Sequence, residues 1–369
     1  MRKTEFKIGN FRKILIASLF SSLFIAISAF PINTFDFRLP TSSSSPIEAA
    51  LGGLNVTSGE DYYLIFSNPA LIRQLKQTNF SISFALLPDN YDEYESVLKT
   101  HQSLQDNNLR GMAFQTRQFT LGYQVLAQEK WKRLTIIEND DADERSASFM
   151  RSNEKYSSIE DKKTYQNYKL NMLAFGIADS VGVLFYGFTG KFLYGRMVYL
   201  EEKLNFNSEN EEENISFIDS SAWGYSFDLG LNNKSKHVSY GIVFYDIYSK
   251  VDWDKNPKGK IKPRLGMGTE LYGKNYSYGI ATNSKAVWKQ DPFYSFFYTH
   301  KYFEKNKQDF QTSVLRLSAT SKNFKSQENT FFNIGFGYYI KIIRVDIALQ
   351  SKGMKSDQTQ YIMSFTLGE

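Results

Sequence analysis

The stretch that decides the fold is residues 223–232, which read Trp-Gly-Tyr-Ser-Phe-Asp-Leu-Gly-Leu-Asn. Large apolar side chains occupy every second position, and small or polar residues stand between them. Because successive side chains of a β-strand point to opposite faces, this period of two predicts a strand with one apolar face. The same pattern recurs at residues 80–86, 343–350 and 361–368. From residue 78 to the end, the chain contains about 16 candidate segments of this kind, some of which we expect to merge or fail.

The candidate strands and the connections between them predict a transmembrane β-barrel. Most segments are about ten residues long, the length that crosses a bilayer at a tilt. Short polar turns occur at 232–236 and 273–275, whereas long acidic loops are expected at 138–163 and 205–214. In lipid, only a closed barrel pairs every strand edge. Aromatic residues near segment ends are expected to form girdles at the two membrane interfaces, and they are Trp223, Trp253, Trp288, Tyr298, Tyr338 and Tyr339.

A soluble β-sandwich is the alternative, because alternation by itself shows only that one face is apolar. Two observations weigh against it. The face opposite the apolar one carries Gly, Ser, Asn and Thr more often than Lys and Glu, unlike an ordinary water-exposed surface. The number of candidate strands also exceeds the roughly seven strands of a typical sandwich.

Composition excludes several other classes of protein. The 369 residues are 42% hydrophobic and 22% charged with a mean hydropathy of −0.41, which excludes a polytopic helical membrane protein, and 16% aromatic residues exclude a disordered chain. Residues 1–29 hold five basic residues and one acidic residue, a net charge of +4. The rest of the chain therefore carries only +1 of the total net charge of +5. A body so close to neutrality argues against nucleic acid as a partner. The absence of cysteine excludes disulfides and thiolate chemistry.

The N-terminus carries the pattern of a secretory signal. Residues 1–13 are basic, 14–27 are apolar, and Ala-Ile-Ser-Ala at 26–29 offers small residues for cleavage. The uncharged stretch 14–35 is also long enough for an uncleaved anchor helix, although Pro31 and the small residues favour cleavage. We therefore expect three parts, in sequence order: a signal peptide (1–29), an N-terminal hatch or plug (30–77) and a transmembrane barrel (78–369).

Two sets of motifs carry a family resemblance. Ala-Ala-Leu-Gly-Gly at 49–53, then Asp61, then Ser-Asn-Pro-Ala-Leu at 67–71 resemble the N-terminal hatch signature of the FadL/PorV-like outer-membrane barrels. A mid-barrel block is also similar to PorV-like members, and it comprises 226–231 with its Asp-Leu-Gly, 239–246, Trp253-Asp254, and 261–268 with its Pro-Arg. The resemblance implies an all-β, antiparallel barrel of about 14 strands, closed by a plug that contains a short helix.

The resemblance also implies a function and a location in the outer membrane. FadL-type members pass small hydrophobic molecules passively through a rearranging hatch, and this is the expected function here. The alternative is a PorV-like role, in which a membrane-embedded accessory serves secretion or surface assembly without transporting anything. The expected partners are outer-membrane lipids together with either a hydrophobic small molecule or a secretion partner protein.

The plug residues implied by the resemblance are Gly52, Gly53, Asn68, Pro69 and Ala70. Physical reasoning agrees, because Gly53 would let the backbone approach the wall, and Asn before Pro favours a cap that starts a short helix. A tight N-terminal turn without contact to cargo would explain these residues equally well. If a hydrophobic ligand binds between hatch and wall, its expected contacts are Leu51, Leu54, Ile65 and Phe66.

No motif supports an enzyme, and we expect no catalytic residue, cofactor or metal. The alternative is an enzyme embedded in the barrel, such as a lipid hydrolase, which requires a histidine, a hydroxyl nucleophile and an orienting polar group brought together across strands. The three histidines, His101, His237 and His300, are isolated, and no zinc-protease, serine-hydrolase or phosphate-loop motif occurs. The remaining possibilities make different structural predictions. A conduit requires an apolar pocket and a gap or inward kink in one strand, a partner protein requires large ordered loops and an occluded lumen, and a soluble exported protein requires polar outer walls.

Overall fold

The computed structural model describes residues 45–75, 77–86, 109–138, 159–207, 210–255, 261, 263–285, 292–305, 310–327, 330–354 and 359–368. The predicted signal peptide and the first part of the predicted plug, residues 30–44, lie outside these ranges. Within the described ranges, no helix combines the length and the apolar character that membrane crossing requires.

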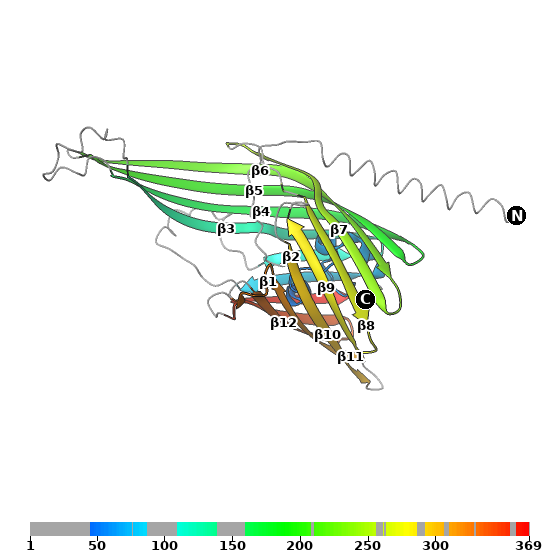
Figure 1. The fold of residues 1–369 in the computed structure, drawn as a ribbon. Helices are drawn as coiled ribbons and strands as arrows, with labels where there is room; N and C mark the ends of the chain where they lie inside the picture. The colour runs from blue at the N-terminus through cyan, green and yellow to red at the C-terminus, as the bar shows by residue number, and fades with distance from the viewer. Residues whose placement is uncertain are drawn as a thin grey trace. The chain divides into compact units, whose positions relative to one another are not determined.

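The described strands form a closed antiparallel barrel (Figure 1). Each strand pairs with its neighbours in sequence, and β1 closes the ring by pairing with β14. The predicted all-β barrel of about 14 strands is therefore confirmed, and the two-sheet sandwich is excluded. The strands are β1 (Asn79–Leu86), β2 (Leu109–Gln115), β3 (Phe119–Glu138), β4 (Ile159–Val181), β5 (Leu184–Asn207), β6 (Asn210–Lys234), β7 (Val238–Trp253), β8 (Arg264–Tyr272), β9 (Tyr276–Lys285), β10 (Phe293–Lys305), β11 (Phe310–Ser321), β12 (Thr330–Ile340), β13 (Ile343–Lys352) and β14 (Thr359–Gly368).

The alternation of the sequence becomes an apolar outer face and a mixed inner face. On β4, Leu173, Phe175 and Ile177 are exposed on the outside, whereas Met172 and Ala174 are buried inside. The same arrangement runs around the ring and leaves many Phe, Tyr, Leu and Ile side chains on the outer wall. A continuous apolar surface of this kind would be unstable in water, so the outer wall faces lipid.

The aromatic residues predicted to form girdles divide between the outer wall, where the prediction stays open, and the lumen, where it is wrong. Trp223 and Tyr298 are exposed on the outer wall. Trp253 is instead buried in the interior cluster, and Tyr339 faces the lumen, where the Arg344 guanidinium lies 4.1 Å from its ring centroid. Trp288 lies outside the described residues. The two errors have one cause: position near a strand end does not reveal which face a side chain occupies.

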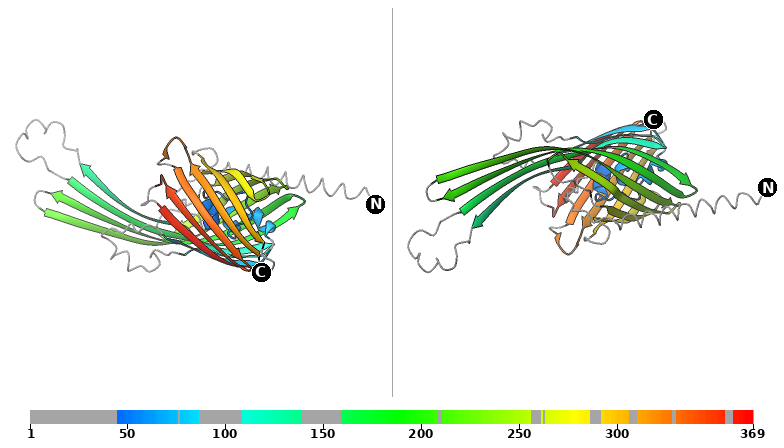
Figure 2. Two further views of the ribbon diagram at one scale, coloured as in Figure 1. Left: turned by 90° about the horizontal axis from the view of Figure 1, so that it is seen from below. Right: turned by 90° about the horizontal axis from the view of Figure 1, so that it is seen from above.

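Four consecutive strands, β3 to β6, are longer than the others and about twice as long as most of them. Strands β3 to β6 have 20 to 25 residues, whereas β8 to β14 have 9 to 13. About ten residues cross a bilayer, so strands of this length extend beyond it. Figure 2 shows these strands, drawn in cyan to green, projecting well past the other strands of the barrel. The prediction of a loop at 205–214 is wrong, because β5 continues to residue 207 and β6 begins at residue 210. Likewise, the segment expected as a loop at 138–163 contains the start of β4.

The N-terminal segment forms three short helices inside the ring, which are drawn in blue in Figure 2. They are α2 (Pro46–Ala50), α3 (Leu64–Ser67) and the 3₁₀ helix η1 (Pro69–Gln74). Ser45 caps α2, and Asn68 caps η1 by accepting a hydrogen bond from the backbone N–H of Ala70 at 3.1 Å. Both helices begin with proline, whose missing N–H costs nothing at a first helical position. We refer to residues 45–75 as the plug.

The plug is packed against two sides of the barrel. Its second half, with Leu64, Ile65, Leu71 and Ile72, joins a large apolar cluster with side chains of β4 to β6. Its first half packs the small residues of α2 against β13 and β14, and the cluster there contains Ala348 and Ile362. The lumen is therefore filled by plug side chains at the level of these clusters.

Candidate functional site

The barrel wall holds the plug by donating hydrogen bonds to its backbone. Hydroxyl groups on four strands each reach a plug carbonyl that no helix satisfies, which removes the cost of burying that carbonyl. The pairs are Ser295 to Leu51 (2.9 Å), Thr320 to Gly52 (3.1 Å), Thr189 to Ile65 (3.3 Å) and Ser239 to Thr57 (3.3 Å). These serine and threonine side chains of the inner face therefore anchor the plug to the wall.

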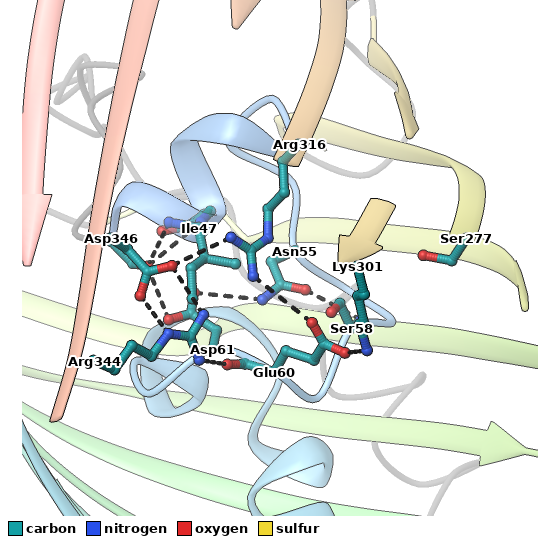
Figure 3. Close-up of polar contacts among 12 residues, drawn as sticks. Ile47, Asn55, Ser58, Glu60, Asp61, Ser277, Lys301, Arg316, Arg344 and Asp346 are labelled. Atoms are coloured by element: carbon teal, nitrogen blue, oxygen red, sulfur yellow. Dashed lines mark hydrogen bonds and ion pairs between the residues drawn. The ribbon is translucent and has the colours of Figure 1, made fainter. Parts of the chain in front are cut away.

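A cluster of charges, which we call the latch, joins the plug to β10, β11 and β13. It consists of Glu60 on the plug and Lys301, Arg316, Arg344 and Asp346 on the wall (Figure 3). Arg344 donates from Nη1 to the backbone carbonyl of Glu60 at 2.8 Å, and it also forms a two-pronged ion pair with Asp346. The Glu60 carboxylate lies beside Lys301 and 3.7 Å from Arg316.

Arg344 is the centre of the latch. Besides its bonds to Glu60 and Asp346, its guanidinium lies over two rings, 4.7 Å from the centroid of Tyr62 and 4.1 Å from that of Tyr339. Planar stacking between aromatic rings together with two-pronged binding of a carboxylate is a geometry that arginine provides and lysine does not. One wall side chain therefore contacts both the backbone and a side chain of the plug.

Asp61 organises the plug internally. Its carboxylate accepts hydrogen bonds from the Ser45 hydroxyl (2.8 Å), the Asn55 amide (3.4 Å) and the Tyr63 backbone N–H (3.1 Å), so that it ties the start of α2 to the loop before α3. Burial raises the pKa of this carboxyl above its ordinary value, against the lowering effects of the Ser45 hydrogen bond and the Arg344 charge. Burial also raises the pKa of the neighbouring Tyr63 phenol.

A second charged group, the wall cluster, lies entirely within the barrel and comprises Lys191, Asp228, Asp246 and Arg264. The Lys191 ammonium lies 2.7 Å from Asp228 and 3.0 Å from Asp246, and Arg264 donates to Asp246 at 3.1 Å. The two cations and two anions balance, which is the arrangement that permits charges to be buried.

The wall cluster surrounds an irregularity in β7. Phe227 of β6 pairs with Tyr248 and Leu229 pairs with Phe244, so residues 245–247 of β7 lie opposite Asp228 alone. Asp246 occupies the left-handed region within this bulge, with φ of 53°, and its backbone N–H donates to the Asp228 carboxylate at 2.8 Å. Extra residues in one strand bend it locally and increase its twist. Register shifts also occur between β1 and β2 and between β3 and β4, and the gap or inward kink expected of a conduit stays a prediction.

The mid-barrel motifs of the sequence meet in this cluster. Asp228 is the Asp of Asp-Leu-Gly, Asp246 ends the 239–246 strand pattern, and Arg264 is the Arg of Pro-Arg. The three motifs contain these residues separately, and nothing in the sequence indicated that they would form one cluster. Lys191 lies in none of the motifs and was not predicted. Arg344 and Asp346 belong to the alternating pattern at 343–350, and no role was expected of them. The available signal was a charged residue between apolar neighbours of a membrane strand.

Four of the five predicted plug residues, Gly52, Asn68, Pro69 and Ala70, lie against the wall, whereas Gly53 is half-buried. A Cβ at Gly52 would lie 2.0 Å from Thr320 Oγ1, so this is the glycine that requires a close approach to the wall. That role was expected of Gly53, and the structure assigns it to Gly52. Asn68 is fully buried, and its amide donates to the carbonyls of Val56 (2.8 Å) and Leu231 (3.3 Å), while Pro69 and Ala70 lie against Gly187 and Gly230.

The four residues expected to contact a hydrophobic ligand are buried in two separate clusters. Ile65 and Phe66 pack in the large cluster, whereas Leu51 and Leu54 pack with Ala281 and Phe297. Two described grooves, of about 830 and 680 Å³, are lined largely by outward-facing side chains and by none of the four. The structure therefore does not join these residues into one pocket, and their contact with a ligand stays a prediction.

The described residues contain no group of three or more potential metal ligands of the His, Cys, Asp or Glu type. His300 accepts or donates a 2.9 Å hydrogen bond with the Tyr298 hydroxyl on the exposed outer wall. His101 lies outside the described ranges.

No family model matches the chain, and no curated protein matches it. Among solved structures, the chain is similar to the toluene transporter TbuX of Ralstonia pickettii, with a TM-score of 0.49, 11% identity, and coverage of 91% of this chain and 98% of that one. It is also similar to the monoaromatic hydrocarbon channel CymD, with a TM-score of 0.49, 10% identity and coverage of 90% and 98%. A mutant of the monoaromatic hydrocarbon channel TodX is similar as well, with a TM-score of 0.48, 10% identity, and coverage of 88% of this chain and 98% of that one. The expected resemblance to FadL-like barrels is confirmed as one of fold, because the described strands close into a ring of 14.

Proposed function

We propose that this protein is an outer-membrane barrel that lets small hydrophobic molecules cross passively when the plug rearranges. The observation that carries the proposal is the way the plug is held. It fills the lumen of a lipid-facing barrel, yet hydrogen bonds and ion pairs attach it to the wall, and these can break and re-form.

The two charge clusters support a plug that moves within a wall that stays closed. The Glu60 side chain of the latch is 32% exposed, so its ion pairs are weak and readily exchanged with water. The Lys191 and Asp228 side chains of the wall cluster are 3% and 0% exposed and hold the β7 bulge in place. Displacing Glu60 would therefore cost less than opening the wall at the β7 bulge.

The proposal is tested by locking the plug to the wall. Ala50 on α2 and Ala348 on β13 belong to one packed cluster, and the native chain has no cysteine, so A50C/A348C offers one engineered disulfide. The assay is uptake of radiolabelled toluene by cells whose outer membrane contains lipopolysaccharide. We expect uptake with the wild-type protein, loss of uptake when the double variant is oxidised, and recovery on reduction.

The single variants A50C and A348C are the matched controls, since each makes the same small change without a cross-link. Both are expected to retain uptake under oxidising conditions. Uptake by the wild type at the level of cells without the protein would overturn the proposal, as would full uptake by the oxidised, cross-linked variant.

The extension of β3 to β6 beyond the bilayer favours a second candidate function. A sheet carried outside the membrane suits a membrane-embedded accessory in secretion or surface assembly, the PorV-like role. In that case toluene uptake would be absent, and deleting the outer halves of these strands would abolish the protein's effect on its partner while leaving the barrel intact.

A further inference from the structure

The outer wall of β4, β5 and β6 changes from apolar to charged within three rows of side chains. Each row joins one residue of β4 to its partners on β5 and β6, and all three rows face outward because they continue the alternation of the exposed Phe175 and Phe188. The first row is Leu173, Phe192 and Tyr225, the second is Asn171, Tyr194 and Trp223, and the third is Lys169, Arg196 and Ser221. The second row therefore marks the edge of the apolar band, where aromatic residues gather at a membrane surface.

This edge lies in the outer leaflet of the membrane. A turn of two residues joins β4, which ends at Val181, to β5, which begins at Leu184, and the short turns of bacterial outer-membrane barrels lie on the periplasmic side. The three rows lie further along both strands, towards the ends that project from the barrel. The outer leaflet at this level consists of lipopolysaccharide, whose lipid A anchor carries phosphate groups on acylated sugars.

A pocket of about 250 Å³ lies between the second and third rows. Its lining consists of the side chains of both rows together with Gly195 and Ala222. Lys169 and Asn171 are only 7% and 8% exposed, although an outward-facing lysine or asparagine is ordinarily exposed. The protein therefore holds both polar side chains in place beside the pocket, as a binding site requires.

The pocket presents hydrogen-bond donors and positive charge. The Asn171 side-chain oxygen accepts a hydrogen bond from the Tyr123 hydroxyl at 2.9 Å, while its Nδ2 makes no hydrogen bond to another residue that the structure describes. Lys169 and Arg196 lie directly opposite each other in the register, where like charges destabilise a pair of strands. An anion between the two side chains would relieve this repulsion.

The carboxylates beside the pocket are already engaged. Asp219 binds the Arg196 guanidinium through two hydrogen bonds, from Nε at 2.9 Å and from Nη2 at 2.5 Å. Asp254 is exposed and accepts a hydrogen bond from Ser221 at the edge of the pocket. The lining side chains themselves include two cations, an amide and hydroxyl groups but no carboxylate, and this is the chemistry that binds phosphate.

An apolar groove continues from the first row towards the periplasmic side. It has a volume of about 680 Å³, and its lining includes Leu173 and Phe192 of the first row, followed by Phe175 and Phe227. The Trp223 ring lies between this groove and the pocket, with its centroid 5.3 Å from that of Phe192 and 6.4 Å from that of Tyr194. A ligand that carries a phosphate next to an acyl chain therefore matches both surfaces.

We propose that the pocket binds a phosphate group of lipid A and that an acyl chain of the same molecule lies in the groove below it. Lys169 and Arg196 supply positive charge, and Asn171 donates from Nδ2 to a phosphate oxygen. Because the site is on the outer wall, binding there is independent of any passage of cargo through the lumen.

The test is a titration of the purified, full-length barrel in detergent with bisphosphorylated lipid A, in which native mass spectrometry counts the bound molecules. K169Q removes the buried cation and should weaken binding about tenfold. N171D keeps the acceptor for Tyr123 and places a carboxylate beside Lys169 and Arg196, so it should weaken binding at least as much. K250Q is the matched control, because Lys250 is on the outer side of β7, pairs with Asp252 and does not line the pocket. It should stay within about twofold of the wild type.

Two further ligands identify what is recognised. Lipid A from which both phosphates have been removed should bind the wild type about as weakly as lipid A binds K169Q. Inorganic phosphate at millimolar concentration should fail to displace lipid A, since it has no acyl chain for the groove. The heat-modified gel shift checks that each variant is folded, and N171D decides the result if K169Q is not.

Three outcomes would overturn the proposal. One is equal binding of lipid A with and without its phosphates. Another is an affinity of the folded variants K169Q and N171D no lower than that of K250Q. The third is displacement of lipid A by inorganic phosphate, which would make the pocket a site for the free anion.

Discussion

The latch and the wall cluster bury similar charges but connect different parts of the molecule. All four side chains of the wall cluster come from strands β5 to β8, so it joins wall to wall. In the latch, Arg344 and its wall neighbours reach Glu60, so it joins wall to plug. Pairs of basic and acidic residues therefore serve two purposes in this protein: they stabilise the barrel wall, and they hold the plug in place.

Exposure separates Glu60, the plug residue of the latch, from the wall cluster, whereas Arg316, Arg344 and Asp346 are buried. The Asp228 and Asp246 side chains are 0% and 1% exposed, whereas that of Glu60 is 32% exposed. A buried charge that loses its partner is much more costly than a half-exposed one. Damage to the wall cluster should therefore unfold the barrel, and damage to the latch should release only the plug.

The largest effect is expected for D246N, which leaves Lys191 and Arg264 with one anion between them. Asparagine keeps the size of the side chain and tolerates the left-handed backbone of this position, so the change isolates the charge. We expect a loss of about 3 kcal/mol in the free energy of unfolding, measured by denaturant titration of the folded band on gels. D252N on the same strand is the control, because Asp252 forms an exposed pair with Lys250. An equal loss in D252N would contradict the distinction.

A smaller and more local effect is expected for Arg344→Met. The substitution removes the bond to the Glu60 carbonyl and the stacking on Tyr62, while Asp346 keeps Arg316 at 3.2 Å. The plug should open more easily by about 2 kcal/mol, seen as faster amide exchange at residues 60–63 with an unchanged barrel transition. R344K retains the charge and should be intermediate. If R344M instead lowers the free energy of unfolding of the barrel as much as D246N does, the latch stabilises the wall and not only the plug.

The sequence was sufficient to predict the barrel because membrane strands impose a strict period of two. Residues 223–232 show the rule, with Trp223 outside and Ser226, Asp228 and Asn232 buried inside. The cap at Asn68 was predictable for a similar reason, since it depends on neighbours in the chain. Local rules of this kind are readable from one sequence.

The charge clusters were not predictable, because their members are separated by many residues. Glu60 and Arg344 meet only once the ring has closed around the plug, and no short-range pattern links them. The extended strands were missed for a different reason. Residues 205–214 are acidic and polar, which is typical of loops, and outside the membrane a strand no longer needs an apolar face.

Seating of the plug can be tested separately from charge at two glycines of β5. A Cβ at Gly187 would lie 2.4 Å from the backbone of Pro69, whereas one at Gly190 would lie 3.8 Å from its nearest neighbour, the Phe227 ring. G187A should therefore displace η1 at a cost of about 1–3 kcal/mol, and G190A should stay within about 0.5 kcal/mol. The measurement is amide exchange at residues 70–75. Equal behaviour of the two variants would mean that the plug does not rest against this strand.

The smallest expected effect is a pH dependence that originates inside the plug. Burial raises the pKa of Asp61 in the folded protein above the ordinary value of 3.8, so between these two values the folded plug binds more protons than the released one. Seating of the plug is then most stable below pH 3.8 and weakens as pH rises through the raised pKa. D61N should remove this slope. S45A deletes a hydrogen bond that favours the ionised carboxylate, so it should extend the slope to higher pH. The measurement is amide exchange at residues 61–63 as a function of pH in the wild type, D61N and S45A. A pH dependence that persists in D61N would assign the titrating group to the latch instead.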